Sequence, residues 1–222
     1  DRLLIHRLQA GGEGKSTSRE RAAPGGLLFE DSDCLVRAVT LVHGTIPVLA
    51  YSLEQAPKFN VRKERLAERG LNPGPWLGQL KKRIAAGDRQ SLVLLPDGSN
   101  ADAGTLADEL LLVTPSQKLV YATDLSDTGA NREKLAALAL GAHAFFCEAG
   151  FREKDRKYAE LSGHLTTRGC TEIARAAGAV RLVPFHFSRR YEKELVLVYD
   201  EVEMGAAGPV IGLNKYQDKK GI

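Results

Sequence analysis

Three residues of the kinds that bind metal ions each end an apolar run of the sequence. His43 ends CLVRAVTLV, Asp124 ends LVYAT and His186 ends RLVPF. Imidazole and carboxylate groups are ligands of Zn²⁺, Mn²⁺ and Fe²⁺, and a carboxylate can bridge two ions. Each residue also has an ordinary structural explanation, as a satisfied histidine or as an aspartate that forms a turn. The residues alone leave both explanations open: one metal site at a sheet edge, or three unconnected strand ends.

Two more residues could do acid–base chemistry beside such a site. His164 lies in SGHLTT, just before a helix start that Thr166 or Thr167 could cap. A histidine on a loop is available for proton transfer. Glu148 ends the apolar run HAFFC, and is either an unpaired acid at a strand end or the partner that orients His164.

Two clusters of basic residues also have both a functional and an ordinary structural explanation. Arg189 and Arg190 come directly after the His186 segment, and Lys81 and Lys82 begin a KKR run. They could bind phosphates or form a solvated charged surface. The string GEGKST at 12–17 is not a phosphate-binding loop, because that motif requires glycine where Gln9 stands.

The elements that must position these residues alternate in the second half of the chain. Strands are expected at 118–124, 143–148 and 180–186, and helices at 131–140, 152–161 and 166–178. Alternating strands and helices predict a layered α/β domain, in which ligands bind where strands end and loops begin.

The first half is less regular. Strands are expected at 1–8, 27–30, 34–42 and 48–53, and a polar, glycine-rich loop at 10–26. A helix with a basic face is expected at 60–69, followed by a turn-rich stretch at 71–80. We interpret residues 55–116 as an insertion outside the layered core, with 55–90 as a basic arm.

Composition excludes few functions. The 222 residues are 43% hydrophobic and 27% charged, with a net charge of +3 that is too small to indicate nucleic acid by itself. Three widely spaced cysteines predict neither a disulfide framework nor a zinc knuckle, which favours a reducing, cytoplasmic setting. No apolar run approaches the ~20 residues of a membrane span, so no membrane contact is expected.

Five motifs, taken in order, resemble ribonuclease Z, the tRNA 3′-processing endonuclease family of the metallo-β-lactamase superfamily. They are LVHGTIPVLAYSLE, LVYATD, FFCEAGF, SGHLTT and FHFSRRY, and the segment KFNVRKERLAERGLNPGPWLGQLKKR between the first two is similar as well. The resemblance runs from about residue 25 to about residue 191. It implies a single αββα sandwich domain over 1–222 with an inserted basic arm.

The resemblance also implies roles for individual residues. His43 would bind one metal ion, His186 another, and Asp124 would bridge both, with two zinc ions expected and manganese or iron as alternatives. His164 would be catalytic, with Glu148 oriented toward it. Leu165 stands where the family usually has serine, and Leu125-Ser126 stand where it has Thr-Arg, which puts a phosphate contact in doubt.

One family motif is absent. No HxHxDH string occurs in these 222 residues. We therefore expect that the amino-terminal portion of the sandwich is lacking, that metal affinity is weak and that this chain alone does not hydrolyse RNA. The implied substrate is precursor tRNA, and the implied assembly is a homodimer. The alternatives are a hydrolase of small phosphodiesters, sulfates or thioesters, which would have no use for a basic arm, and a non-catalytic paralogue.

Overall fold

The computed structural model describes residues 2–8 and 16–212. It contains two compact units, one made of residues 1–55 and 117–222 and the other of residues 56–116. The elements of the first unit are, in chain order, β1 (Arg2–Leu8), β2 (Ser16–Ala22), the 3₁₀ turn η1 (Pro24–Gly26), β3 (Leu27–Glu30), β4 (Cys34–His43), β5 (Ile46–Gln55), β10 (Gln117–Ala122), α4 (Gly129–Leu138), β11 (Ala144–Glu148), η2 (Glu153–Asp155), α5 (Arg156–Ser162), α6 (Thr167–Ala176), β12 (Leu182–Phe185), η3 (Arg189–Tyr191) and α7 (Leu195–Gly205).

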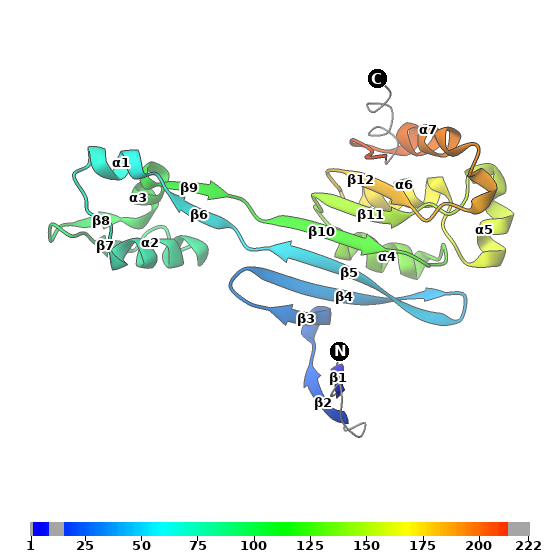
Figure 1. Cartoon of the computed structure of the whole chain (residues 1–222), viewed down its shortest axis with the longest axis horizontal. Coiled ribbons are helices and arrows are strands. Elements are labelled where there is room, and N and C mark those ends of the chain that lie inside the picture. The colour runs from blue at the N-terminus through cyan, green and yellow to red at the C-terminus, as the bar shows by residue number, and fades with distance from the viewer. Residues whose placement is uncertain (1, 9–15, 213–222) are drawn as a thin grey trace. The chain divides into compact units, whose positions relative to one another are not determined.

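A six-stranded mixed sheet forms the centre of the first unit, in the order β12-β11-β10-β5-β4-β3 (Figure 1). Strands β10, β11 and β12 are parallel to one another, whereas β10 is antiparallel to β5 and β5 is antiparallel to β4. It follows that β4 runs in the same direction as β10, β11 and β12. The carboxyl ends of these four strands therefore lie at one edge of the sheet.

Helices α4, α6 and α7 cover one face of this sheet. Their apolar side chains, including Leu135, Ile173 and Val202, pack with strand residues such as Val120 and Phe145 in the main hydrophobic core. All five of these side chains are buried. Because the parallel connections β10–α4–β11 and β11–α6–β12 each include a helix, the sequence alternates strand and helix here.

The opposite face of the sheet is apolar and exposed. Strand β5 alternates between buried Ala50 and Ser52 on the helix side and Leu49, Tyr51 and Leu53 on the other side, each at least 40% exposed. The neighbouring strand β10 repeats this pattern. A sheet with one covered face is half of a sandwich, so the α/β class is confirmed, and in the described residues the six-stranded sheet has one helical layer.

The second unit has a hydrophobic core of its own. Its elements are β6 (Lys58–Val61), α1 (Lys63–Glu68), α2 (Pro75–Ala85), β7 (Leu92–Leu94), β8 (Asn100–Asp102), α3 (Ala103–Leu110) and β9 (Leu111–Thr114). Strand β6 pairs with β9, and β7 pairs with β8. Trp76, the one tryptophan of the sequence, packs with Leu80 and Leu106 in this core. The expected arm at 55–90 falls in this unit, which continues to Ser116.

Local structure differs from the sequence-based expectation in three places. Residues 16–22 of the expected loop form strand β2, which pairs antiparallel with β1, while residues 9–15, with most of GEGKST, lie outside the described residues. Asn60 and Val61 belong to β6, so the helix α1 is shorter than expected. The turn-rich stretch contains the start of α2, because Pro75 occupies the first turn, where its missing N–H is not needed.

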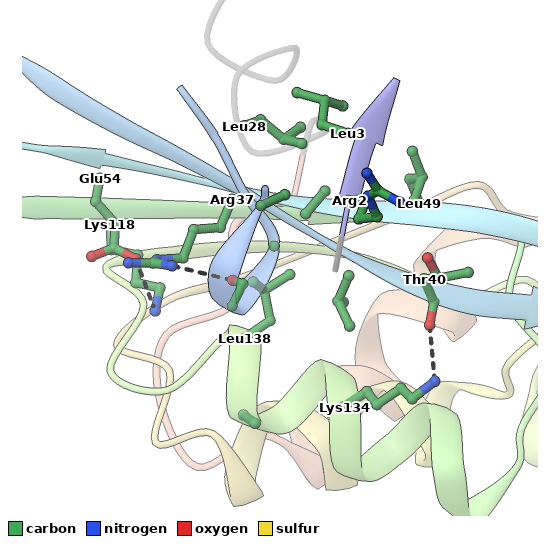
Figure 2. A pocket seen from close by; sticks show the side chains of 16 residues that line it. Arg2, Leu3, Leu28, Arg37, Thr40, Leu49, Glu54, Lys118, Lys134 and Leu138 are labelled. Carbon is green, nitrogen blue, oxygen red and sulfur yellow. Dashed lines mark hydrogen bonds and ion pairs between the residues drawn. The ribbon is translucent and has the colours of Figure 1, made fainter. Parts of the chain in front are cut away.

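A cavity of about 890 Å³ lies beside β4, at the edge where β3 no longer pairs with it (Figure 2). Arg37, Lys118 and Lys134 line it, and each already has a partner: the carbonyls of Pro24 and Gly25, the carboxylate of Glu54 and the carbonyl of Thr40 respectively. None of the expected metal ligands lines this cavity. It is therefore separate from the carboxyl edge of the sheet.

Candidate metal centre

Side chains from four strand ends and one loop meet at the carboxyl edge of the main sheet. His43 is the last residue of β4, Glu148 is the last residue of β11, and His186 directly follows β12. Asp124 lies two residues beyond β10. His164 comes from the loop between α5 and α6. The common direction of these strands brings together residues that are up to 143 positions apart.

His164 lies at the middle of this group. Its ring centroid is 4.8 Å from that of His43 and 5.2 Å from that of His186. Ligand atoms of His43, Asp124 and His164 all lie within 4.8 Å of one another, and so do those of Glu148, His164 and His186. His186 Nε2 is 3.3 Å from Asp124 Oδ1. These separations are short enough for neighbouring side chains to share one ion.

Glu148 connects His164 to the segment that carries Asp124. Its carboxylate is fully buried, accepts the backbone N–H of Leu125 at 2.7 Å, and lies 2.8 Å from His164 Nδ1. This hydrogen bond raises the pKa of His164 above its ordinary value. A carboxylate only accepts, so Nδ1 of His164 carries a proton and its Nε2 is the nitrogen left for a ligand or substrate.

Two of the expected ligands have left-handed backbone conformations. Asp124 has φ 54° and His186 has φ 61°, and they are the only described residues other than glycine with positive φ. Such conformations cost of order 1 kcal/mol or more for a residue with a side chain, and they concentrate at functional sites. Thr123 Oγ1 additionally donates a hydrogen bond to Asp124 Oδ2 at 3.0 Å. The chain thus turns sharply where each of these ligands leaves its strand.

The residues present suit a transition-metal ion. Imidazole nitrogens and a carboxylate are the ligands of zinc and related ions, and each histidine at the centre of the group has its second ring nitrogen held by the protein. His43 Nδ1 lies 2.8 Å from the carbonyl oxygen of Gly163, and His164 Nδ1 is held by Glu148. Asp124 and His186 remain about 40% exposed, so an ion would have a route to them.

The structure separates the two arginines that follow His186. Arg190 lies over the rings of Tyr158 and Phe151, at 4.1 and 5.3 Å from their centroids, and its guanidinium is 3.3 Å from Asp155. Arg189 is exposed and forms no ion pair with the part of the chain described here. Arg190 is therefore committed to a stacked cluster, whereas Arg189 is free for another partner.

Lys81 and Lys82 lie in α2 of the second unit, whereas the metal-ligand group belongs to the first unit. Four arginines of that unit are paired with acids, in Arg65–Glu68, Arg69–Glu109, Arg83–Asp88 and Arg89–Asp108. Within 16–212, Lys81 and Lys82 have no such pair. Four of the nine lysine and arginine residues of this unit are thus already paired with acids.

Comparison with known proteins agrees with the order of motifs. The chain is 35% identical over 192 residues to ribonuclease Z of Synechococcus sp. (strain CC9605), which covers 85% of this chain and 52% of that protein. It is 34% identical over 168 residues to ribonuclease Z of Deinococcus radiodurans, with 76% and 48% covered. The chain spans about half the length of the curated relatives it matches. No family model matches the sequence.

Solved structures give weaker similarities. The metallo-beta-lactamase fold protein YhfI from Bacillus subtilis has a TM-score of 0.48 at 14% identity, over 84% of this chain and 49% of that one. Human tRNase Z, short form, has a TM-score of 0.42 at 20% identity, over 75% and 41%. Among the described helices, none has the length and apolar character needed to cross a membrane.

The molecule is thus an α/β protein with histidine and carboxylate side chains gathered at the carboxyl edge of its sheet. Over most of its residues it is similar to proteins named ribonuclease Z.

Sequence reasoning missed the residues that hold these side chains in place. Asn131 was expected only as the start of a helix, yet its amide is 2% exposed and bonds to the strand that carries His43. Gly163 and Ser126 also contact His43 or its neighbours. The motif SGHLTT contained one signal, since glycine readily adopts the left-handed conformation that Gly163 has, with φ 75°.

Proposed function

We propose that this chain carries part of the active site of a metal-dependent phosphodiesterase of the ribonuclease Z type, which removes 3′ trailers from precursor tRNA by endonucleolytic hydrolysis. The observation that supports this most is the convergence of His43, Asp124, His164 and His186 at one sheet edge. The relatives named ribonuclease Z support the choice of reaction. We propose zinc as the metal and two as the number of ions, with a cytoplasmic homodimer as the working assembly.

In this proposal, His43 would bind one metal ion and His186 the other. Asp124, which lies near both histidines, would be a ligand of both ions. When bound, the ions activate water for attack on phosphorus and stabilise negative charge on the phosphate oxygens. His164 in its imidazolium form would present Nε2–H toward the leaving oxygen and give that proton up, while its Nδ1–H stays hydrogen-bonded to Glu148. The raised pKa of His164 keeps more of the proton-donating form at neutral pH.

The basic residues would contact the RNA. Arg189, which is exposed and has no ion-pair partner among the described residues, is the better phosphate contact of the two arginines after His186. Arg190 supports the site by stacking on Phe151, whose ring centroid is 6.2 Å from that of His164. Lys81 and Lys82 would bind phosphates farther along the substrate.

Two other functions keep some support. The paired arginines of the second unit weaken the case for RNA and favour a hydrolase of small phosphodiesters. The absent HxHxDH motif favours a binding protein without catalysis. Cleavage of bis(p-nitrophenyl) phosphate without binding of precursor tRNA would support the first, and binding of precursor tRNA without metal would support the second.

Metal stoichiometry tests the proposal directly. The purified 222-residue chain is dialysed to equilibrium against Zn²⁺, and its bound metal is measured by elemental analysis. Because the HxHxDH ligands are absent, we expect weak zinc binding in the wild type and weaker binding in Asp124→Ala, while Asp200→Ala, which changes an exposed acid of α7 outside the group, binds zinc as the wild type does. Equal zinc content in all three proteins would contradict the proposal.

The two arginines allow a matched test of the substrate. Arg189→Ala should weaken binding of precursor tRNA without changing thermal stability. Arg190→Ala should lower thermal stability, because it removes the stacking on Tyr158 and Phe151 and leaves Asp155 without this partner. Unchanged RNA affinity in Arg189→Ala would remove this residue from the proposed substrate site.

A further inference from the structure

We infer that Gly163, Ser126 and Asn131 are positioning residues for His43: together they fix its tautomer and hold the end of β4, so that Nε2 of His43 is the nitrogen offered to a metal ion. This inference rests on the proposed function only where it concerns metal. The placement of His43 by these three residues is a property of the chain without metal.

The tautomer of His43 follows from its hydrogen bond. Nδ1 lies 2.8 Å from the carbonyl oxygen of Gly163. A carbonyl can only accept, so Nδ1 must carry the proton and Nε2 must carry the lone pair. A histidine whose second ring nitrogen donates to a carbonyl is oriented and made more basic for metal binding. The backbone of residue 163 therefore selects the metal-binding nitrogen of residue 43.

Two features favour glycine at position 163: its backbone conformation and its closeness to His43. Gly163 ends α5 in the left-handed region at φ 75°, which turns its carbonyl toward His43. A Cβ at this position would lie 3.0 Å from His43 Nδ1, 3.2 Å from His43 Cε1 and 3.2 Å from Ser126 Oγ. To admit a side chain at position 163, the His43 imidazole or Ser126 would have to move by a few tenths of an ångström.

Asn131 holds the strand immediately before His43. Its buried amide accepts the backbone N–H of Val42 at 3.0 Å and donates to the carbonyls of Val42 and Ser126, both at 2.8 Å. Val42 lies beyond the part of β4 that pairs with β3. The side chain of Asn131 thus occupies the place that a neighbouring strand would take.

Ser126 completes the connection on the other side of His43. Its backbone N–H donates to the Val42 carbonyl at 2.9 Å, and its Oγ accepts the backbone N–H of Gly44 at 2.7 Å. Residues 42 and 44 are therefore both fixed to the segment that follows Asp124. One turn of α4 beyond Asn131, Lys134 donates to the Thr40 carbonyl at 3.2 Å and extends this closure of the strand edge (Figure 2).

These hydrogen bonds connect the segments that carry two expected ligands, His43 and Asp124. Asp124 lies two positions before Ser126, so the same segment that carries the carboxylate also holds the backbone around His43. Because these bonds do not depend on an ion, the site is arranged before metal binds. Loss of such supporting bonds typically costs about 10- to 100-fold in metal affinity.

Gly163→Ala tests the inference, with Gly178→Ala as the matched control. Gly178 is also left-handed, at φ 59°, but nothing lies within 4 Å of the Cβ that alanine would add. Both variants pay a similar backbone cost, and only Gly163→Ala disturbs His43. We expect Co²⁺ affinity about 10- to 100-fold lower in Gly163→Ala than in Gly178→Ala.

A second readout uses the metal-free chain. Long-range ¹H–¹⁵N spectra of the histidine side chains, assigned by comparison with His43→Ala, should show His43 protonated at Nδ1 in the wild type and in Gly178→Ala. Gly163→Ala should lose this pattern. Ser126→Ala, a smaller change, serves if Gly163→Ala does not fold, and should broaden or shift the His43 signals while those of His143 stay in place.

The outcomes separate the inference from the proposed function. A wild type that binds no Co²⁺ but shows the Nδ1–H tautomer would contradict the proposed function and leave the positioning role standing. Equal Co²⁺ affinity and an unchanged His43 tautomer in Gly163→Ala and Gly178→Ala would overturn the inference. So would a wild-type His43 that is protonated at Nε2.

Discussion

The carboxyl edge of the main sheet and the second unit use polar residues in opposite ways. At the sheet edge, Glu148 and Asn131 are buried and every hydrogen-bonding group of their side chains that the structure describes is engaged with a strand end or a ligand-bearing loop. In the second unit, the charged residues lie around an apolar core and form isolated surface pairs. The buried hydrogen bonds at the sheet edge hold the expected ligands in fixed positions. The second unit is a stable apolar core with charged residues on its surface.

The largest expected effect is at the sheet edge. Glu148→Ala would leave the Leu125 N–H and the His164 Nδ1–H without their acceptor inside the protein, and each such loss costs about 1 to 3 kcal/mol. We expect the free energy of unfolding of the first unit, followed by circular dichroism in urea, to fall by several kcal/mol. Glu148→Gln keeps one acceptor and should cost less. An unfolding curve for Glu148→Ala that matches the wild type would show that the buried carboxylate does not fix this edge.

The contrast also shows what sequence reasoning could reach. The motif order and the alternation of strands and helices predicted the α/β class and which residues end the strands. They did not reveal that β4 is parallel to β10, which is what brings His43 to the same edge as Asp124, because strand direction depends on pairings between distant residues. The supporting role of Asn131 was hidden for the same reason, since its partner Val42 lies 89 positions away.

In the second unit, errors had a local cause. The sequence LNPGPWLGQL contains proline and glycine and therefore indicated turns, but Pro75 begins a helix that buries Trp76 and Leu80. Packing against α3 stabilises this segment as a helix. The sequence of the segment alone does not show that contact. The interpretation of 55–116 as an insertion stays a prediction, and the second compact unit spans residues 56–116.

A core substitution in the second unit would show whether the two regions are independent. Leu80 is fully buried, so Leu80→Ala should destabilise this unit by about 2 to 5 kcal/mol. Trp76 lies in the same core and is the one tryptophan of the chain, so its fluorescence reports on this unit. We expect the Trp76 fluorescence transition of Leu80→Ala to occur at a lower urea concentration than that of the wild type, and Co²⁺ binding to be unchanged. Loss of Co²⁺ binding in Leu80→Ala would contradict independence.

We expect a smaller effect on RNA binding in the second unit. It should be larger for substitution of the unpaired lysines than for substitution of an arginine that is already paired with an acid. If Lys81 and Lys82 contact phosphates, the double variant Lys81→Ala/Lys82→Ala should reduce the slope of log affinity against log salt concentration by about 2, roughly 1 for each contact. Arg83→Ala is the matched control in the same helix, because Arg83 is already 3.1 Å from Asp88. Filter binding of precursor tRNA between low and moderate salt would measure both. Equal slopes in the two variants would remove the lysines from the RNA contact.

The smallest effect concerns the ion pairs that hold α6 in the first unit. Glu172 accepts hydrogen bonds from Arg132 and Arg168, which lower its pKa to about 2 from an ordinary value of 4.5. A carboxyl group with a lowered pKa in the folded state stabilises the fold above the unfolded pKa, and this contribution is lost as pH falls toward the folded pKa. Glu172→Gln should therefore be less stable than the wild type at pH 6 by about 1 kcal/mol or less, because the group is partly exposed. The difference should shrink between pH 4.5 and pH 2.

Glu160→Gln, which changes an exposed acid of α5, serves as the control. A wild-type advantage that stays constant down to pH 2 would show that charge on Glu172 does not contribute, and that the first unit, like the second, is held by its core rather than by its ion pairs.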